Sequence, residues 1–361
     1  MGSNVLTRRD GTLDITRMSS IVDSVAALHA AGVEVILVSS GAVASGRGEL
    51  RHRTDLRPLD DVSARQLFSA VGQAKLINRY YEFFREHGIA CGQVLTTKEN
   101  FSTRRHYLNQ QHCMDVMLRN GVIPVVNEND TVSVTELMFT DNDELSGLIA
   151  SMMNVDTLVI LSNIDGIYTG LPDDPSSRLI RTVRPADDLD AYICASKSSL
   201  GRGGMTTKYR IARKVASEGI EVVIANGKRE GVLCDIILGT DPDVPHTAFV
   251  PAPHTSSGIK KWIAHSDSFA KGTLHVNAGA AEALMHSPGV SLLPVGVVGA
   301  DGDFAQDDIV TVAGPDGRTI GWGRVALDCK SVREVMGRSG GRPLIHADYM
   351  YIDEKFNFRD L

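Results

Sequence analysis

Apolar positions follow two alternating patterns over the first two thirds of the chain. Apolar residues at the three-and-four spacing of a helix occupy 18–28, and a short run rich in β-branched residues follows at 33–38. Similar β-branched runs recur at 122–126, 157–161 and 221–225, each separated from the next by enough residues for a helix. Strands joined through helices require crossover connections, so this part is predicted to be an α/β fold with a largely parallel sheet sandwiched by helices.

The pattern changes beyond residue 250. Prolines and small polar residues open a predicted linker at 251–271. Four short apolar runs bounded by turn residues follow, at 274–276, 289–293, 308–312 and 319–323. Gly314-Pro-Asp-Gly317 separates the last two runs as a hairpin turn would. We therefore predict an α/β domain over 1–250, a linker over 251–271 and a small β-rich domain over 272–361.

Composition narrows the class of protein. The chain has 361 residues, 43% of them hydrophobic and 22% charged, which is ordinary for a globular protein of two domains. It contains no apolar run of about eighteen residues and begins without a hydrophobic signal region, so we expect no membrane span and a cytoplasmic location. The five cysteines are scattered and never spaced C-x-x-C, which argues against disulfides and zinc. A net charge of −7 disfavours a protein that grips a polyanion along its length.

A glycine-rich run, Gly201-Arg-Gly-Gly-Met-Thr-Thr-Lys208, opens directly into a helical pattern. Glycines let backbone N–H groups approach phosphate oxygens, and a lysine one turn later supplies a cation for a transferring phosphoryl group. The run is not a Walker loop, because Thr207 stands where that motif has a glycine. A flexible turn followed by a solvated lysine is the alternative that the run alone leaves open.

Polar clusters follow three of the predicted strands, where ligands of open α/β sheets gather. Ser39-Ser-Gly-Ala42 comes after the first run, Asn127-Glu-Asn-Asp130 after the next, and Thr140-Asp-Asn-Asp143 ten residues later. Ser162-Asn163 ends the following run. Taken singly, each segment has a plainer alternative: a helix cap for the first, solvated loops for the two clusters that contain Asn and Asp, and a plain turn for Ser162-Asn163. Together they favour a site that orients a small charged substrate. No histidine pair, His106 and His112 included, has metal-ligand spacing, so no protein metal site is predicted.

In order and spacing, these motifs resemble those of the glutamate 5-kinases, in the amino acid kinase superfamily, over nearly the whole chain. The tail from about residue 272 is similar to a PUA domain. The resemblance implies ATP-dependent phosphorylation of the γ-carboxylate of L-glutamate to L-glutamyl 5-phosphate, the first step of proline biosynthesis. It also implies Mg²⁺ bound with ATP, feedback inhibition by L-proline, and a homo-oligomer, either a tetramer or a dimer.

The resemblance further assigns roles to single residues. The positions that match glutamate-contacting or supporting residues are Ser40, Asn127, Asp130 and Asn142. The positions that match the nucleotide loops are Ser162, Asn163, Arg202, Gly203, Gly204, Met205, Thr206, Thr207 and Lys208. Lys208 matches the catalytic lysine, and Asp141 or Asp143 is expected to hold catalytic lysines in place. Ser162-Asn163 replaces a Thr-Asp pair of the family, so an amide stands in place of its acid.

One departure from the family lies at the amino end. The family begins with a strand leading into Lys-x-Gly-[Ser/Thr], whose lysine stabilises the transferring phosphoryl group. Here Gly2-Ser3 are present and Met1 occupies the x position, so the lysine would fall one residue earlier. We therefore expect this chain to be an amino-terminally shortened version of a complete enzyme, without its first strand and with low or no kinase activity.

Two alternatives stay open at this point. One is a different amino acid kinase, such as an aspartokinase, acetylglutamate kinase or uridylate kinase, which the PUA-like tail and the Asn127 to Asp130 segment count against. The other is a kinase-inactive regulator that binds RNA through the tail, which the acidic net charge counts against.

Overall fold

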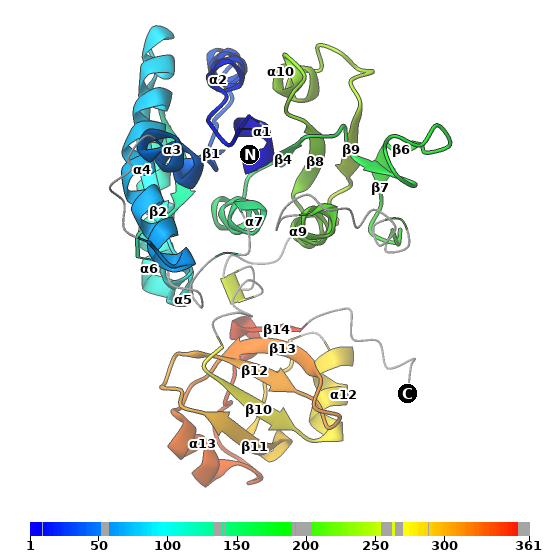
Figure 1. Cartoon of the computed structure of the whole chain (residues 1–361). Helices are drawn as coiled ribbons and strands as arrows, with labels where there is room; N and C mark the ends of the chain where they lie inside the picture. Colours follow the sequence, from blue (N-terminus) through cyan, green and yellow to red (C-terminus); the bar gives the residue numbers. More distant parts are fainter. Residues whose placement is uncertain are drawn as a thin grey trace. The chain divides into compact units, whose positions relative to one another are not determined.

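The computed structural model describes residues 1–8, 10–51, 58–132, 139, 142–189, 192, 204–253, 262–263, 270–287 and 289–352. The chain forms two compact units, and Figure 1 labels their elements. The first unit comprises Met1–Lys98 and Leu108–Thr255, and the second comprises Glu99–Tyr107 and Ser256–Leu361.

Two sheets form the centre of the first unit. In one, β3 (Val122–Glu128) lies between β1 (Leu37–Val38) and β2 (Ala90–Thr96), and both pairs are parallel. In the other, β4 (Thr157–Ser162) pairs in parallel with β8 (Glu221–Asn226), followed by β9 (His246–Phe249) and β7 (Thr182–Val183). Only the β8–β9 pair of this sheet is antiparallel. A separate two-stranded ribbon joins β5 (Ile167–Tyr168) to β6 (Leu179–Ile180).

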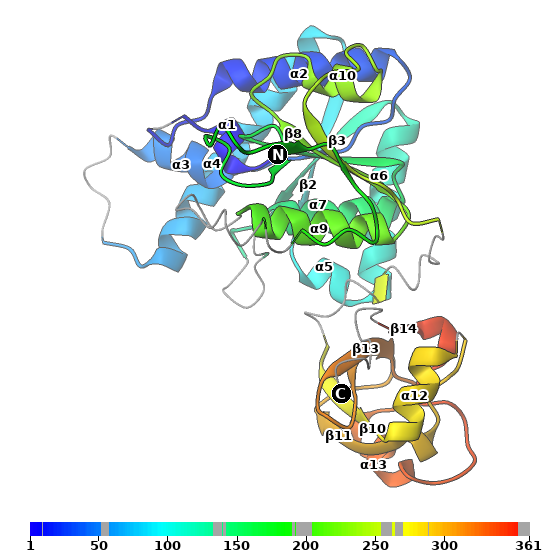
Figure 2. The same cartoon turned by 90° about the vertical axis from the view of Figure 1, so that its right-hand side faces the viewer.

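Helices cover both faces of these sheets. Figure 2 shows α2 (Ile15–Ala30) and α10 (Val232–Ile237) on one face, and α7 (Asn142–Met153) and α9 (Met205–Ser217) on the other. The remaining helices of this unit are α1 (Ser3–Leu6), α3 (Ala42–Leu50), α4 (Asp61–Glu86) and most of α6 (Arg104–Arg119). The first residues of α6 and the short helix α5 (Glu99–Ser102) belong to the second unit. The predicted α/β sandwich is therefore confirmed. None of the helices in the described ranges combines the length and the apolar character needed to cross a membrane.

The strand predicted at 33–38 forms a ladder only at Leu37–Val38. Among the described residues, β1 pairs with β3 alone, although Val33 and Val35 pack partly buried against the core. Met1 lies against the end of β1: its nitrogen donates to the Val38 carbonyl oxygen at 2.8 Å, and the Ser40 N–H donates to the Met1 carbonyl oxygen at 3.2 Å. These two bonds have the pattern of a parallel strand pair.

Two glycines allow α3 and α4 to touch through their backbones. A Cβ on Gly46 would overlap the carbonyl oxygen of Phe68, and one on Gly72 would overlap that of Ala42. Asp60 caps the start of α4 by accepting from the N–H groups of Val62 at 3.0 Å and Ser63 at 2.9 Å. The close contact between α3 and α4 fixes the inner face of α4 beside the segment that follows β1.

A five-stranded sheet forms the second unit, in the order β11-β10-β12-β13-β14. Its strands are β10 (Gly272–Val276), β11 (Val297–Gly302), β12 (Ile309–Ala313), β13 (Thr319–Arg324) and β14 (Met350–Ile352). Its helical segments are α12 (Ala278–His286), α13 (Cys329–Val335), η3 (Pro294–Gly296) and η4 (Ala347–Tyr349). β12 and β13 form the predicted hairpin, and Gly317 takes the positive φ (77°) of its turn. The run at 289–293 is not a strand, because only Leu292 bridges, to Ile345.

Candidate active site

Four polar segments lie where strands end or helices begin. Ser40 follows β1, Asn127 and Glu128 end β3, Asn142 and Asp143 open α7, and Lys208 lies near the start of α9. Parallel strands end at the same edge of a sheet, and helix N-termini point their free N–H groups toward that edge. The described contacts link these segments in three groups.

The first group is a buried ion pair. The Lys208 ammonium group contacts the Asp143 carboxylate directly, and the two side chains are only 10% and 6% exposed. A buried lysine requires such a partner, because an unpaired charge in a low-dielectric interior is costly. A Cβ placed on Gly2 would lie 4.0 Å from Nζ of Lys208, so the amino-terminal segment lies directly beside this lysine.

The second group joins β1 to α7. Nδ2 of Asn142 donates to Oγ of Ser40 at 2.5 Å and to the Ser39 carbonyl oxygen at 3.0 Å. Ser39 is fully buried, and its hydroxyl shares a 2.7 Å hydrogen bond with the Tyr80 hydroxyl. Burial raises the pKa of Tyr80 well above its ordinary value, so this support stays neutral. The turn after β1 is therefore held in place from both sides.

Asn127 belongs to the third group and lies at the end of β3. Its Oδ1 accepts from the backbone N–H of Glu128 at 2.9 Å, and its Nδ2 donates to Oε1 of Gln73 at 3.4 Å. Nε2 of Gln73 returns a bond to the Glu128 carbonyl oxygen at 3.0 Å. These bonds fix the end of the strand, which suits a supporting position rather than one that contacts a ligand.

Two buried carboxylates lie further along this group. Arg65 of α4 donates to Oδ1 of Asp130 from Nε at 2.8 Å and from Nη2 at 2.5 Å, and Nη2 also reaches Oε2 of Glu128 at 3.3 Å. Oε1 of Glu128 accepts from the Phe139 N–H at 3.0 Å. Burial and the neighbouring Asp130 carboxylate raise the pKa of Glu128 to about 7. Glu128 is therefore partly protonated near neutral pH.

The predicted nucleotide residues lie on two elements. Gly204 is the N-cap of α9 and makes no side-chain cap bond, so Met205, Thr206 and Thr207 form a first turn with backbone N–H groups at its start. At the end of β4, Ser162 is buried and Asn163 exposed, with Oγ of Ser162 donating to Oδ1 of Asn163 at 3.5 Å. The predicted positions Asp141, Arg202 and Gly203 lie outside the described residues.

The structure thus brings Ser40 to Asn142 and Asp143 to Lys208, from segments more than sixty residues apart. The sequence interpretation assigned no role to Arg65, Glu128 or Gln73. One signal was available: the polar residues Arg65, Ser69 and Gln73 recur every fourth position in a helical segment, so they share one face of α4. Each of them bonds to the segment from Glu128 to Asp130.

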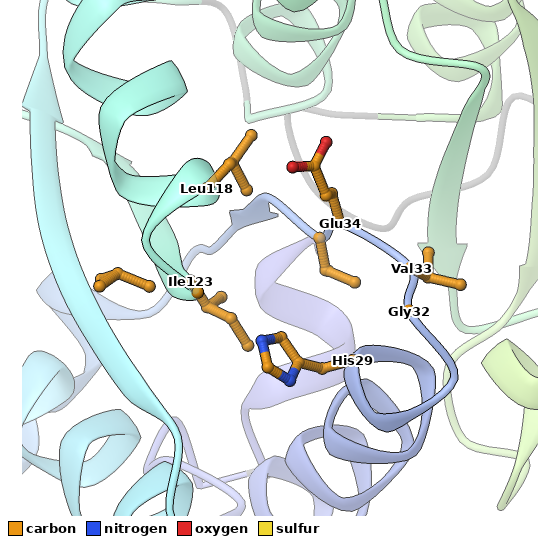
Figure 3. A pocket seen from close by; sticks show the side chains of 9 residues that line it. His29, Gly32, Val33, Glu34, Leu118 and Ile123 are labelled. Atoms are coloured by element: carbon orange, nitrogen blue, oxygen red, sulfur yellow. The ribbon is translucent and has the colours of Figure 1, made fainter.

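A small pocket lies elsewhere in the first unit. It has a volume of about 120 Å³ and is lined by the end of α2, the segment before β1, and the junction of α6 with β3. Figure 3 shows the His29 ring in this pocket with Leu118 and Ile123. Gly121 and Val122 place it at the amino end of β3, away from the polar segments described above. Ligand pockets usually exceed about 300 Å³, so it is too small for a nucleotide.

Comparison with known proteins identifies the family. A sequence model of the amino acid kinase family matches residues 1–226, and one of the PUA domain matches residues 272–343. The glutamate 5-kinase of Bacteroides thetaiotaomicron is 61% identical over 353 residues, which cover 98% of this chain and 97% of that protein. The glutamate 5-kinase of Chlorobaculum tepidum is 43% identical, over 98% of this chain and 96% of that protein. The one of Myxococcus xanthus is 39% identical, over 100% of this chain and 94% of that protein.

Among solved structures, an isopentenyl phosphate kinase aligns with 69% of this chain and 98% of its own, with a TM-score of 0.47 at 18% identity. That similarity is low, and the assignment comes from the sequence relatives, which match this chain along nearly its full length. The chain belongs to the amino acid kinase family and, within it, to the glutamate 5-kinases, and it carries a PUA domain.

Proposed function

We propose that this chain transfers the γ-phosphoryl group of ATP to the γ-carboxylate of L-glutamate, forming L-glutamyl 5-phosphate for proline biosynthesis. The observation that carries the proposal is the buried Lys208–Asp143 pair, which lies at the start of α9 behind the glycine-rich segment. Relatives that bear the name glutamate 5-kinase match the chain over this whole region.

Lys208 and Asp143 supply the catalytic electrostatics. The γ-carboxylate of glutamate is already ionised at neutral pH, so the reaction needs alignment and charge neutralisation rather than a general base. The ammonium group of Lys208 neutralises charge that builds on the transferring phosphoryl group. Asp143 fixes the position of that ammonium group through the buried ion pair. The contribution of Asp141 is a parallel proposal that rests on the family resemblance alone.

The amino acid would bind against the other two groups. Ser40 and Asn142 offer a hydroxyl and an amide at the end of β1, which suit the carboxylate end of the substrate. Asp130 offers a buried carboxylate, which suits the α-ammonium group. Asn127 supports this arrangement through Gln73.

The nucleotide would bind at the start of α9 and the end of β4. Backbone N–H groups at Gly204 to Thr206 suit the phosphates, with Arg202, Gly203 and Thr207 as further proposed contacts. Ser162 and Asn163 are proposed to contact the nucleotide from β4. In the described ranges no cluster of three acidic, histidine or cysteine side chains forms a metal cage. Mg²⁺ would arrive on ATP, held mainly by phosphates and water.

Several further parts of the proposal concern the whole protein. L-Proline shares the α-carboxyl and α-amino groups of glutamate, which supports it as an inhibitor at the same pocket.

We also propose a kinase domain over 1–250, a linker over 251–271, a PUA-like domain over 272–361, a homo-oligomer and a cytoplasmic location. Filter binding with structured RNA measures whether the PUA domain also binds nucleic acid.

A coupled assay of ADP release tests the proposed reaction. The chain, extended at its amino end by a short apolar strand ending in lysine (the lysine-extended chain), is given MgATP with L-glutamate, N-acetylglutamate, L-aspartate or UMP, and only L-glutamate is expected to stimulate turnover. Lys208→Ala should abolish this stimulation, whereas Arg210→Ala, which changes an exposed cation two residues later, should not. Equal stimulation by another acceptor, or full activity of Lys208→Ala, would refute the proposal.

A further inference from the structure

Arg65 is the cation that two buried carboxylates share. Asp130 and Glu128 lie two residues apart at the end of β3, and their side chains are only 7% and 5% exposed. Two carboxyl groups buried so close together lose their hydration and repel each other when both are ionised, so a cationic partner is needed. The Arg65 guanidinium contacts both, at 2.5 Å from Asp130 and 3.3 Å from Glu128.

The geometry of these bonds is asymmetric. Both donors that Arg65 gives to Asp130 end on Oδ1, from Nε at 2.8 Å and from Nη2 at 2.5 Å. Within the described residues, Oδ2 accepts only a long bond of 3.5 Å from the Ser69 hydroxyl. A carboxylate held at one oxygen in this way is fixed in orientation, and its second oxygen can accept a hydrogen bond from a charged donor.

We propose that Arg65 is a positioning residue for the amino acid substrate: it fixes Oδ1 of Asp130 so that Oδ2 is presented to the α-ammonium group. This inference rests on the proposed function, and it concerns a residue that would act through Asp130 rather than on the reacting atoms. Glu128 completes the arrangement by anchoring Nη2 of Arg65, while its own Oε1 is held by the Phe139 N–H at 3.0 Å.

Other charged groups around the cluster belong to neighbouring elements. Lys98, in the loop after β2, acts on Glu128 electrostatically and pairs with Glu144 of α7 at 3.4 Å. The amide of Gln66 donates to the Thr131 carbonyl oxygen at 3.1 Å and so ties α4 to the segment after Asp130. Among the described residues, Arg65 is therefore the cation that bonds directly to Asp130, whereas Lys98 pairs with Glu144.

Calorimetric binding tests this role without requiring turnover. L-Glutamate is titrated into the full chain in the presence of a non-hydrolysable ATP analogue, and the analogue is titrated alone. Arg65→Met should weaken glutamate binding at least tenfold and leave analogue binding within about twofold. Arg65→Lys, which keeps the charge and loses the forked donors, should fall between Arg65→Met and the unchanged protein. Arg79→Met, which changes a half-exposed arginine of the same helix that pairs with Glu82, is the matched control.

A double variant distinguishes positioning from a merely structural role. If Arg65 acts through Asp130, adding Arg65→Met to Asp130→Asn should cost no further glutamate affinity. Additive losses, or equal losses for glutamate and the ATP analogue, would overturn the inference. A wild-type chain that binds the analogue but neither binds nor phosphorylates glutamate would instead refute the proposed function, so the two failures are distinguishable.

Discussion

At the scale of single residues, the candidate site consists of buried charges that compensate one another. Asp143 pairs with Lys208, and Arg65 joins Asp130 to Glu128. Buried pairs of this kind contribute little net stability, since desolvation offsets their attraction, yet removing one partner is strongly destabilising. Their arrangement is therefore better explained by the need to hold charges in place for a ligand.

Asp143→Asn tests whether the carboxylate positions the lysine. The variant leaves Lys208 buried beside a neutral amide, so its ammonium group is less stable and less well placed. We expect kcat to fall about 10²–10³-fold, comparable to the loss of one electrostatic stabiliser. Steady-state kinetics of the lysine-extended chain give the result, with Asp156→Asn, an exposed carboxylate just after α7, as the control. Unchanged kcat would exclude this role.

Glu128→Gln tests the buried carboxyl group through pH. The folded-state pKa of Glu128 is raised from 4.5 to about 7, so the native state keeps a proton that the unfolded chain has released. Its contribution to stability is therefore greatest below about pH 4.5 and is lost as the pH rises through about 7. The Tm of Glu128→Gln relative to wild type should rise by a few degrees between pH 5 and pH 8. A pH-independent difference would contradict the raised pKa.

The sequence predicted part of this residue-scale arrangement. From the sequence, four residues were identifiable because polar side chains seldom end buried strands or follow glycine-rich runs: Ser40, Asn142, Asp143 and Lys208. Arg65 was not, because an arginine in an amphipathic helix ordinarily faces solvent. Only the packing of α4 against the end of β3 turns it inward, and that contact joins residues 65 positions apart.

At the scale of elements, backbone contact between α3 and α4 sets the position of the polar face of α4. Gly72→Ala should destabilise the protein by about 1–3 kcal/mol or more, because the added Cβ meets the Ala42 carbonyl group rather than a flexible side chain. Gly48→Ala in α3 is the matched control, since its nearest neighbour is Cγ2 of Thr12 at 3.9 Å. That variant should be neutral or stabilising. Denaturant unfolding compares the two, and equal effects would refute the packing argument.

A second element-scale prediction concerns β1 and β4. Among the described residues, β1 pairs only with β3 and β4 only with β8. Met1 already forms both bonds of a parallel pair with the end of β1, and it shares one core cluster with Leu37 and Leu161. Figure 1 places the first residues between β1 and β4. A short apolar strand ending in lysine, placed before Met1, should therefore pair alongside β1 and bring a second cation beside Lys208.

Two extended chains separate these effects. One carries the apolar strand ending in lysine, and the other carries the same strand ending in alanine. Both should raise the Tm by completing the pairing, and only the lysine version should raise kcat, by about 10²–10³-fold. Equal, robust kcat values for the extended and original chains would contradict this prediction.

At the scale of the whole molecule, the alternation of apolar runs predicted the α/β class because each run is long enough to be buried and each gap is long enough for a crossover. The division of the chain was harder to predict. Glu99–Tyr107 lies within the first two hundred residues yet belongs to the second unit. Its partner is Trp262, whose Nε1 donates to the Phe101 carbonyl oxygen at 2.8 Å across 161 positions. A local sequence pattern cannot predict a contact between residues so far apart in the sequence.

The most direct test of the account is the formation of an acyl phosphate that depends on Lys208. The lysine-extended chain, incubated with MgATP and L-glutamate, is trapped with hydroxylamine, and the glutamyl hydroxamate is quantified. The account predicts glutamate-dependent product that falls at least 10²-fold in Lys208→Ala. Product formed at the same rate by Lys208→Ala, or ATP consumption without glutamyl hydroxamate, would contradict it.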